Sequence, residues 1–253
     1  MGRLPVPPVI TCLIRPEDLD GEEVRITGDS YRHLFRARRL AGGARLRLTD
    51  GGGRARWGEV AAIGSRSAQI LLGEAAPRHE AGRIVKLLVA VPRLQRASWL
   101  VEKATELGAA EIRFLRTERT SHPLSEGKLK RLRRVAAAAL EQCHGSTLPR
   151  VTGPHELSEA PALLEGCGSR RYLDLPGAGI ATGDGPRASA TALLVGPEGG
   201  WSEAERTALE GWLCGAWSLG ERVLRIETAA VVALGLLLHA AASGDAGSAA
   251  ASV

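Results

Sequence analysis

Two glycine-bearing turns follow predicted strands in the C-terminal half of the chain and carry the residues best suited to chemistry. Residues 191–205 read TALLVGPEGGWSEAE, an apolar β-prone run, a turn, and a helix start marked by Ser202 and Glu205. Such a turn lies outside the carboxyl end of a strand, where α/β sheets bind ligands, and its glycines let backbone amides approach a ligand closely. It lacks the Lys and Ser/Thr of a phosphate loop and the spacing of a dinucleotide fingerprint, so we expect neither a nucleoside triphosphate nor NAD. A purely structural turn is the alternative.

The second turn, LGERVLRIET at residues 219–228, leads directly into an apolar helix. One helix separates the two turns in the sequence. Because both turns follow strands, they are positioned to line a single pocket.

The elements around these turns divide the chain into two parts. Short strands at 24–27, 45–48, 57–63 and 68–72 predict a small barrel, with a basic helix at 30–40 between the first two. Residues 75–82 read as a linker. Strands then alternate with helices, which predicts a parallel sheet covered on both faces and a boundary near residue 78. The predicted strands are 84–91, 111–115, 171–175, 192–195 and 216–219, and the predicted helices are 98–107, 128–142, 155–165, the one starting at 202, and 227–241. We expect a flexible loop at 182–189 and a disordered tail from residue 243.

The chain is basic, with a formal charge of +5, and most of its 33 basic residues are arginine. Guanidinium groups suit phosphate recognition, although arginine codons favoured by a GC-rich genome are an alternative explanation. The basic helix carries Arg32, His33, Arg36, Arg38 and Arg39, which we expect to contact phosphates rather than form only a solvated face. Arg116 and Arg119, near a strand end, are further candidate RNA contacts.

Composition also limits the partners. The four cysteines form no C-x-x-C pair, so we predict neither a zinc site nor a disulfide framework, and expect reduced thiols in a cytoplasm. We expect no secretory signal, because the N-terminal residues include no apolar run, and the apolar run 229–238 is too short to cross a bilayer, which needs about 20 residues. We therefore expect no membrane association and no metal.

The pair GPEGGWSEAE and LGERVLRIETAA resembles the ribosomal small-subunit RNA uridine N3-methyltransferases of the SPOUT superfamily. The segments EKATELG at 102–108, TERT at 117–120, EQCHG at 141–145 and the basic stretch 31–39 are also similar to this family, in the same order. The resemblance covers most of the chain. Two positions depart from the family's pattern, Ile226 in place of a threonine and Glu221 in place of a proline or basic residue.

The resemblance implies a PUA-like β-barrel that binds RNA at residues 1–78, followed by an α/β methyltransferase domain with a deep trefoil knot at 79–243 and a disordered tail at 244–253. It also implies a homodimer through the C-terminal domain, S-adenosylmethionine as the cofactor, and 16S ribosomal RNA or the small subunit as the substrate. The cofactor-binding residues that it implies are Leu194, Val195, Gly196, Pro197, Glu198, Gly199, Gly200, Leu219, Gly220, Val223, Leu224, Arg225 and Thr228. His144, in the EQCHG segment, is placed with the RNA contacts. The alternatives are a histidine whose ring is satisfied within the fold and a catalytic role.

Methylation of uridine N3 requires removal of a proton and stabilisation of the resulting anion. We expect Arg225 to be the cation that faces the uracil oxygens, with a structural ion pair as the alternative. Burial beside a ligand raises a carboxylate's pKa towards neutrality, so carboxylates in the two turns are candidate bases. These are Glu198 and Glu227. The alternative role of Glu198 is to accept backbone N–H bonds that hold its loop, and that of Glu227 is to interact with the positive N-terminal end of the last helix. Two other functions stay open, a SPOUT methyltransferase acting on another RNA site and a non-catalytic RNA-binding protein.

Overall fold

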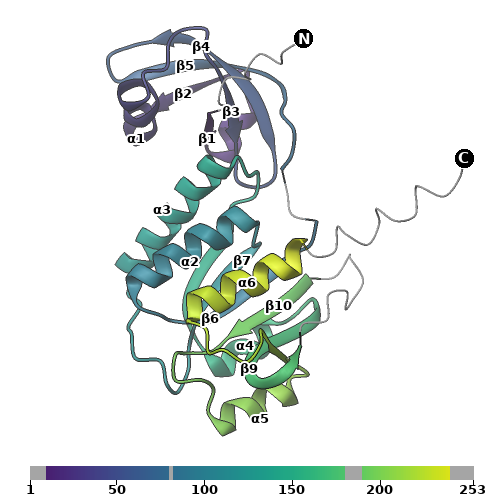
Figure 1. Cartoon of the computed structure of the whole chain (residues 1–253). Helices are drawn as coiled ribbons and strands as arrows, with labels where there is room; N and C mark the ends of the chain where they lie inside the picture. Colours follow the sequence, from purple (N-terminus) through teal and green to yellow (C-terminus); the bar gives the residue numbers. More distant parts are fainter. Residues whose placement is uncertain (1–9, 80–81, 180–189, 240–253) are drawn as a thin grey trace, which may run out of the picture. The chain divides into compact units, whose positions relative to one another are not determined.

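The computed structural model describes residues 10–79, 82–179 and 190–239 (Figure 1). Within these ranges the chain forms two compact units. The first contains residues 10–79 together with 137–148, and the second contains the remaining described residues. The predicted loop 182–189, the end of the terminal helix at 240–241 and the tail 244–253 lie outside the described residues. No helix in the described ranges has the length and apolar character needed to span a membrane.

The first unit is built on a five-stranded curled sheet with the order β1-β3-β4-β5-β2. Its strands are β1 Thr11–Leu13, β2 Glu23–Thr27, β3 Arg45–Thr49, β4 Ala55–Ile63 and β5 Ser67–Ala75. Neighbours are antiparallel except β1 and β3, and alternate apolar side chains such as Ile26, Leu48 and Ile70 form the core. The edge strands β1 and β2 do not pair with each other, so the predicted barrel is an open curled sheet.

The predicted helix 30–40 is shorter and irregular. It consists of α1 Gly28–Tyr31 followed by one stretch of π-helix, Arg32–Ala37. A separate short 3-10 helix, Pro16–Asp20, lies before β2 in the chain. Tyr31 anchors the helix because its ring stacks on Phe35 at 5.3 Å and its hydroxyl donates to the Gly64 carbonyl at 2.7 Å.

Segment 137–148 completes the first unit around a buried cation. Arg47 of β3 is almost fully buried, and it donates to the carbonyl oxygens of Gly145 at 3.0 Å and Pro77 at 3.2 Å and to the Ser146 hydroxyl. The Leu13 amide donates to Glu141 Oε1 at 2.8 Å. The three bonds from Arg47 pair both of its Nη atoms, which lowers the cost of burying the guanidinium.

The second unit contains a six-stranded sheet with the order β11-β9-β10-β6-β7-β8, in which every neighbouring pair is parallel. The strands are β6 Val85–Ala90, β7 Glu111–Arg116, β8 Arg150–Glu156, β9 Cys167–Gly179, β10 Ala190–Val195 and β11 Gly215–Ser218. The predicted parallel sheet is confirmed. Since all strands run in one direction, their carboxyl ends meet at one edge. The chain moves outward through β6, β7 and β8 and then fills the opposite side, which makes the β10–β6 boundary a switch point where such sheets bind ligands.

Helices cover both faces of this sheet, as predicted (Figure 1). Helices α2 Leu94–Leu107 and α6 Ile226–His239 pack on each other, and α6 also packs on β6 and β10. The other face lies under α5 Glu203–Gly211 and the short α4 Ala160–Leu163, through a cluster that includes Leu164, Leu194, Trp201 and Leu209. Helix α3 Glu126–Cys143 connects β7 to β8.

Several element predictions for the second unit had the wrong bounds, and the strand predicted at 171–175 is the longer β9, Cys167–Gly179. The helix predicted at 155–165 begins later, because residues up to Glu156 extend β8, which pairs with β7, and only a 3-10 turn, Leu157–Glu159, and α4 follow. Helix α2 begins at Leu94 instead of residue 98.

Candidate functional site

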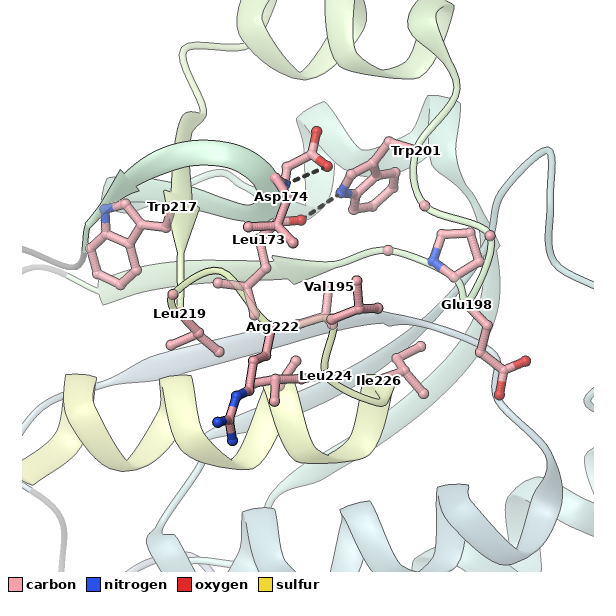
Figure 2. A pocket seen from close by; sticks show the side chains of 18 residues that line it. Leu173, Asp174, Val195, Glu198, Trp201, Trp217, Leu219, Arg222, Leu224 and Ile226 are labelled. Atoms are coloured by element: carbon pink, nitrogen blue, oxygen red, sulfur yellow. Dashed lines mark hydrogen bonds between the residues drawn. The ribbon is translucent and has the colours of Figure 1, made fainter.

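A cavity of about 300 Å³ opens at the carboxyl ends of β9, β10 and β11 (Figure 2). These three strands are neighbours in the sheet, and Val195 at the end of β10 pairs in register with Leu173 of β9. The loops that leave β10 and β11 therefore reach the same place, which brings the two glycine turns together.

Ten of the residues that the resemblance implies for cofactor binding line this cavity: Val195, Gly196, Pro197, Glu198, Gly199, Gly200, Leu219, Gly220, Val223 and Leu224. Leu194 does not, because its side chain lies in the core cluster with Trp201 and Leu209. Arg225 and Thr228 line a second cavity.

Sequence reasoning missed eight residues that line the first cavity: Leu173, Asp174, Leu175, Trp201, Trp217, Arg222, Ile226 and Ala229. Trp201 lies inside the segment GPEGGWSEAE, and Arg222, Ile226 and Ala229 lie inside LGERVLRIETAA, so these motifs already marked them. Leu173, Asp174 and Leu175 reach the cavity from β9, and Trp217 reaches it from β11. Their local sequences carry no signal, since only the pairing of β9 with β10 and β11 brings them there.

Gly196 makes room for an indole ring. The Trp201 side chain is buried beside Gly196, and its Nε1 donates to the Leu173 carbonyl at 3.0 Å (Figure 2). A Cβ on residue 196 would lie 2.8 Å from the indole, closer than real Cβ contacts allow. Gly200 has a φ of +70°, a conformation that favours glycine. The packing of Trp201 beside Gly196 and the positive φ of Gly200 thus both restrict the conformation of the turn.

A capping box starts α5 directly after the first turn, as predicted. Ser202 Oγ accepts from the Glu205 amide at 3.2 Å, and Glu205 Oε2 accepts from the Ser202 amide at 2.9 Å. The second oxygen of Glu205 accepts from the Glu118 amide at 2.8 Å. Glu205 therefore ties the segment after β7 to the start of α5.

Asp174 is the acidic residue that β9 adds to the first cavity. Arg206 of α5 holds it in a bidentate pair, with Nε to Oδ2 at 2.5 Å and Nη2 to Oδ1 at 3.2 Å. The pair orients the carboxylate beside the cavity, and the Arg206 guanidinium offsets its negative charge.

The second cavity, of about 340 Å³, is lined by Gln95, Arg96, Trp99, Arg225, Glu227 and Thr228. It contains two of the three predicted catalytic residues, Arg225 and Glu227. Arg96, which sequence reasoning missed, forms an ion pair with Glu198, and its Nε lies 3.7 Å from Glu227 Oε1. No three His, Cys, Asp or Glu side chains converge on a possible metal position in the described part of the chain.

The predicted RNA contacts fall into both units. Arg32, His33, Arg36, Arg38 and Arg39 are all exposed on the first unit. Arg32 pairs with Asp29, and Arg36 donates to the Ser65 carbonyl at 2.9 Å. In the second unit, Arg116 pairs with Glu156 at 2.6 Å and Arg119 donates to the Gly199 carbonyl at 2.7 Å.

His144 belongs to the first unit and has a φ of +59°. Its Nδ1 forms a hydrogen bond with Thr11 Oγ1 at 2.9 Å. Partial burial lowers the pKa of its imidazole, and the nearby charges of Arg47, His79 and Arg38 lower it further. The neutral ring is therefore favoured at this position.

Comparison with known proteins gives consistent results. Residues 79–238 match the RNA methyltransferase domain, and residues 26–72 match the RNA methyltransferase PUA domain. Ribosomal RNA small subunit methyltransferase E of Synechocystis sp. is 30% identical over 229 residues, which cover 88% of this chain and 75% of that protein. The protein of the same name from Mycobacterium tuberculosis is 31% identical over 229 residues, covering 83% and 84% respectively. The crystal structure of ribosomal RNA small subunit methyltransferase E from Neisseria gonorrhoeae, bound to S-adenosyl methionine, aligns with a TM-score of 0.80 at 25% identity. That alignment covers 90% of this chain and 96% of the other.

Proposed function

The chain belongs to the RNA methyltransferase family, and we propose that it transfers the methyl group of S-adenosylmethionine to N3 of a uridine in 16S ribosomal RNA. The observation that carries the proposal is the first cavity, which both glycine turns line at the carboxyl edge of a parallel sheet. The names of the relatives support the ribosomal substrate, and the resemblance of the two turns supports the N3 position.

The first cavity fits the proposed cofactor. Its volume of about 300 Å³ lies in the range of small-molecule sites, and it combines apolar walls with a few charged groups. Val195, Leu219 and Leu224 offer apolar surface for a base, while the 196–200 turn offers backbone amides. Bound S-adenosylmethionine supplies an electrophilic methyl group on a sulfonium sulfur.

The remaining chemistry belongs to the side chains near the second cavity. Arg225 is proposed to stabilise the negative charge that develops on the uracil oxygens, and Glu198 or Glu227 to accept the N3 proton. The presence of Arg225 and Glu227 on one cavity supports these roles. Arg225→Ala is expected to remove most turnover while the Kd for S-adenosylmethionine, measured by calorimetry, stays near the wild-type value. Near-wild-type turnover would exclude Arg225 from the mechanism.

Nucleoside analysis of a deletion strain tests the reaction itself. Loss of 3-methyluridine from 16S RNA, restored by a plasmid copy, is the expected result. If 3-methyluridine is unchanged and another methylated nucleoside disappears, the enzyme acts on another RNA site. If calorimetry detects no binding of S-adenosylmethionine, the chain is instead a non-catalytic RNA-binding protein.

We assign RNA docking to residues 1–78 and methyl transfer to residues 79–243, a division that the matched ranges 26–72 and 79–238 support. The exposed basic residues of the 30–40 region are proposed to contact phosphates. The substrate is accordingly 16S RNA or the small subunit.

A homodimer through the second unit is also proposed. Helix α6 is apolar on nearly all sides, and its Val232 and Leu236 remain exposed in the single chain. A partner subunit would cover this face. We further propose a trefoil knot in this unit, as the resemblance to the SPOUT enzymes implies. A crystallographic backbone trace that closes into an unknotted ring would contradict the knot.

A further inference from the structure

Arg96 connects the two cavities of the second unit. Its guanidinium forms an ion pair with Glu198, which lines the first cavity, and lies 3.7 Å from Glu227, which lines the second together with Arg96 itself. The three residues come from α2, the turn after β10 and the start of α6. The ion pair with Glu198 therefore links a residue that lines the first cavity to one that lines the second.

Glu227 has an oxygen without a partner. The residue is only 8% exposed, and its Oε2 has no hydrogen-bond donor among the residues that the structure describes. A buried carboxylate oxygen without a donor is costly, so a retained one indicates a donor supplied from outside the chain. Because Glu227 lines the second cavity, a ligand in that cavity would supply it.

An aromatic side chain lies on the same cavity. Trp99 of α2 is 42% exposed, although large aromatic rings are normally well buried. Exposed rings of this kind stack on unpaired RNA bases. The cavity thus combines a stacking surface, a hydrogen-bond acceptor and, at Arg225, a cation.

We propose that the second cavity binds the target uracil base, with the N3–H group donating to Glu227 Oε2 and the ring stacking on Trp99. This inference rests on the proposed function and extends it to base selection. Uracil carries a hydrogen on N3, whereas cytosine presents a lone pair there. The Glu227 carboxylate attracts the first and repels the second, so Glu227 determines the preference for uracil over cytosine.

The same contact provides the proton step. The N3–H bond breaks and its proton moves to Glu227 Oε2, while the N3 electron pair forms a bond to the methyl carbon. The carbon–sulfur bond breaks and its electrons remain on sulfur, which leaves 3-methyluridine and neutral S-adenosylhomocysteine. Glu227 then releases its proton to water. Arg225 stabilises the uracil anion during this step.

Arg96 and Glu198 act through Glu227. The Arg96 guanidinium lies beside Glu227 Oε1, and Oε2 is the carboxylate oxygen that is buried without a donor among the described residues. Glu198 is half exposed and already paired with Arg96, and in Figure 2 its carboxylate points away from Trp201. We therefore assign the base role to Glu227 and positioning roles to Arg96 and Glu198.

Binding of free nucleotides tests the subsite without turnover. Uridine 5′-monophosphate and cytidine 5′-monophosphate are titrated into the full-length protein and followed by ligand-observed NMR. The wild-type protein is expected to prefer the uridine nucleotide at least about tenfold, and Glu227→Gln to lose most of that preference. Trp99→Ala is expected to weaken uridine nucleotide binding about tenfold, whereas Trp99→Phe retains it. Absence of uridine nucleotide binding, or an unchanged preference in Glu227→Gln, would overturn the proposal.

Matched variants separate this role from a structural one. Glu203→Gln removes a carboxylate from the first turn of α5, as Glu227→Gln does from the first turn of α6. It is expected to leave the Kd values of both nucleotides unchanged. Arg96→Ala is expected to lower kcat about 100-fold with the Kd for S-adenosylmethionine unchanged, and Arg96→Lys to restore part of kcat. Equal loss of cofactor binding in Arg96→Ala would indicate a merely structural ion pair.

The outcome distinguishes the subsite from the proposed function. If the deletion strain loses 3-methyluridine but Glu227→Gln and Trp99→Ala methylate small subunits at the wild-type rate, the subsite is wrong and the function stands. If the deletion strain keeps its 3-methyluridine, the proposed function is wrong, and the nucleotide titrations still decide whether the cavity selects uracil.

Discussion

Arg119 donates a hydrogen bond from Nη1 to the carbonyl oxygen of Gly199 at 2.7 Å, across 80 residues of sequence. With the bond from the Glu118 amide to Glu205, it holds the 117–120 segment against the turn after β10. A residue expected at the sequence level to contact RNA thus supports the wall of the first cavity. Arg119 is an exposed residue, so this contact is compatible with a contact to RNA.

Arg119→Ala is expected to raise the Kd for S-adenosylmethionine about threefold to tenfold, the value of one hydrogen bond that orders the turn. Calorimetry on the full-length protein measures this. Arg116→Ala is the matched control, because Arg116 is a nearby exposed arginine whose guanidinium pairs with Glu156. Equal Kd values for the wild type and Arg119→Ala would show that the turn holds itself in place.

Gly196→Ala is expected to lower the free energy of unfolding by about 1–3 kcal/mol, because the new Cβ would lie 2.8 Å from the buried Trp201 indole. The displaced indole should also weaken cofactor binding. Urea unfolding followed by circular dichroism gives the first quantity. Gly211→Ala provides the comparison, since a Cβ there meets no atom within 4 Å. A Gly196→Ala protein as stable as wild type would mean that the indole moves at no cost.

His144→Asn is expected to flatten the pH dependence of thermal stability. The folded chain lowers the pKa of His144 below its usual 6.5, so the unfolded chain binds this proton more readily. The folded state therefore loses stability as the pH falls from about 7 through 6.5 towards the lower pKa of the folded chain. Asparagine does not titrate and tolerates the positive φ of residue 144. Melting temperatures between pH 7 and pH 5 provide the measurement, and parallel curves for the two proteins would contradict the prediction.

The combined variant Arg36→Ala, Arg38→Ala is expected to weaken RNA binding and to reduce its salt dependence. Each phosphate contact that is lost removes about 0.7–0.9 from the slope of log K against log salt. Filter binding to 16S RNA at several salt concentrations measures the slope. Arg15→Ala, at an exposed arginine paired with Asp18, should leave it unchanged. If the slope of the double variant equals that of wild type, the first unit does not hold the phosphates through these side chains.

Val232→Glu is expected to convert a dimer into monomers, because it places a charge on the exposed apolar face of α6. Sedimentation velocity reports the mass. Leu213→Glu changes a more exposed leucine outside α6 and should leave the assembly intact. A monomeric wild-type protein, or a dimeric Val232→Glu protein, would remove α6 from the proposed interface.

The parts of the fold that follow local rules were predictable from the sequence. The Ser202–Glu205 capping box and the change of period after residue 82 predicted α5 and the parallel sheet, because both depend on near neighbours in the chain. The 155–165 helix failed because pairing of β8 with β7 overrides the helical preference of its first residues.

Some residues of the candidate site could likewise be predicted from the local sequence, and others could not. The two glycine turns could be identified from their composition. Asp174 and Trp217, in contrast, reach the cavity only because β9 lies between β10 and β11. Arg96 could not be predicted either, since nothing in the sequence at the start of α2 indicates that its side chain meets two carboxylates from distant segments. Contacts of this kind are set by strand order, which a single sequence does not reveal.

The buried Arg47 limits how this protein can be divided or recombined. Its acceptors include Pro77 and residues 145–146. A protein fragment that ends near residue 80 would therefore bury the Arg47 guanidinium without its acceptors Gly145 and Ser146. Transfer of the N-terminal strands to another protein as a cassette would therefore need the later segment as well. Evolutionary exchange of this unit is constrained for the same reason, since a single crossover near residue 80 separates Arg47 from these two acceptors.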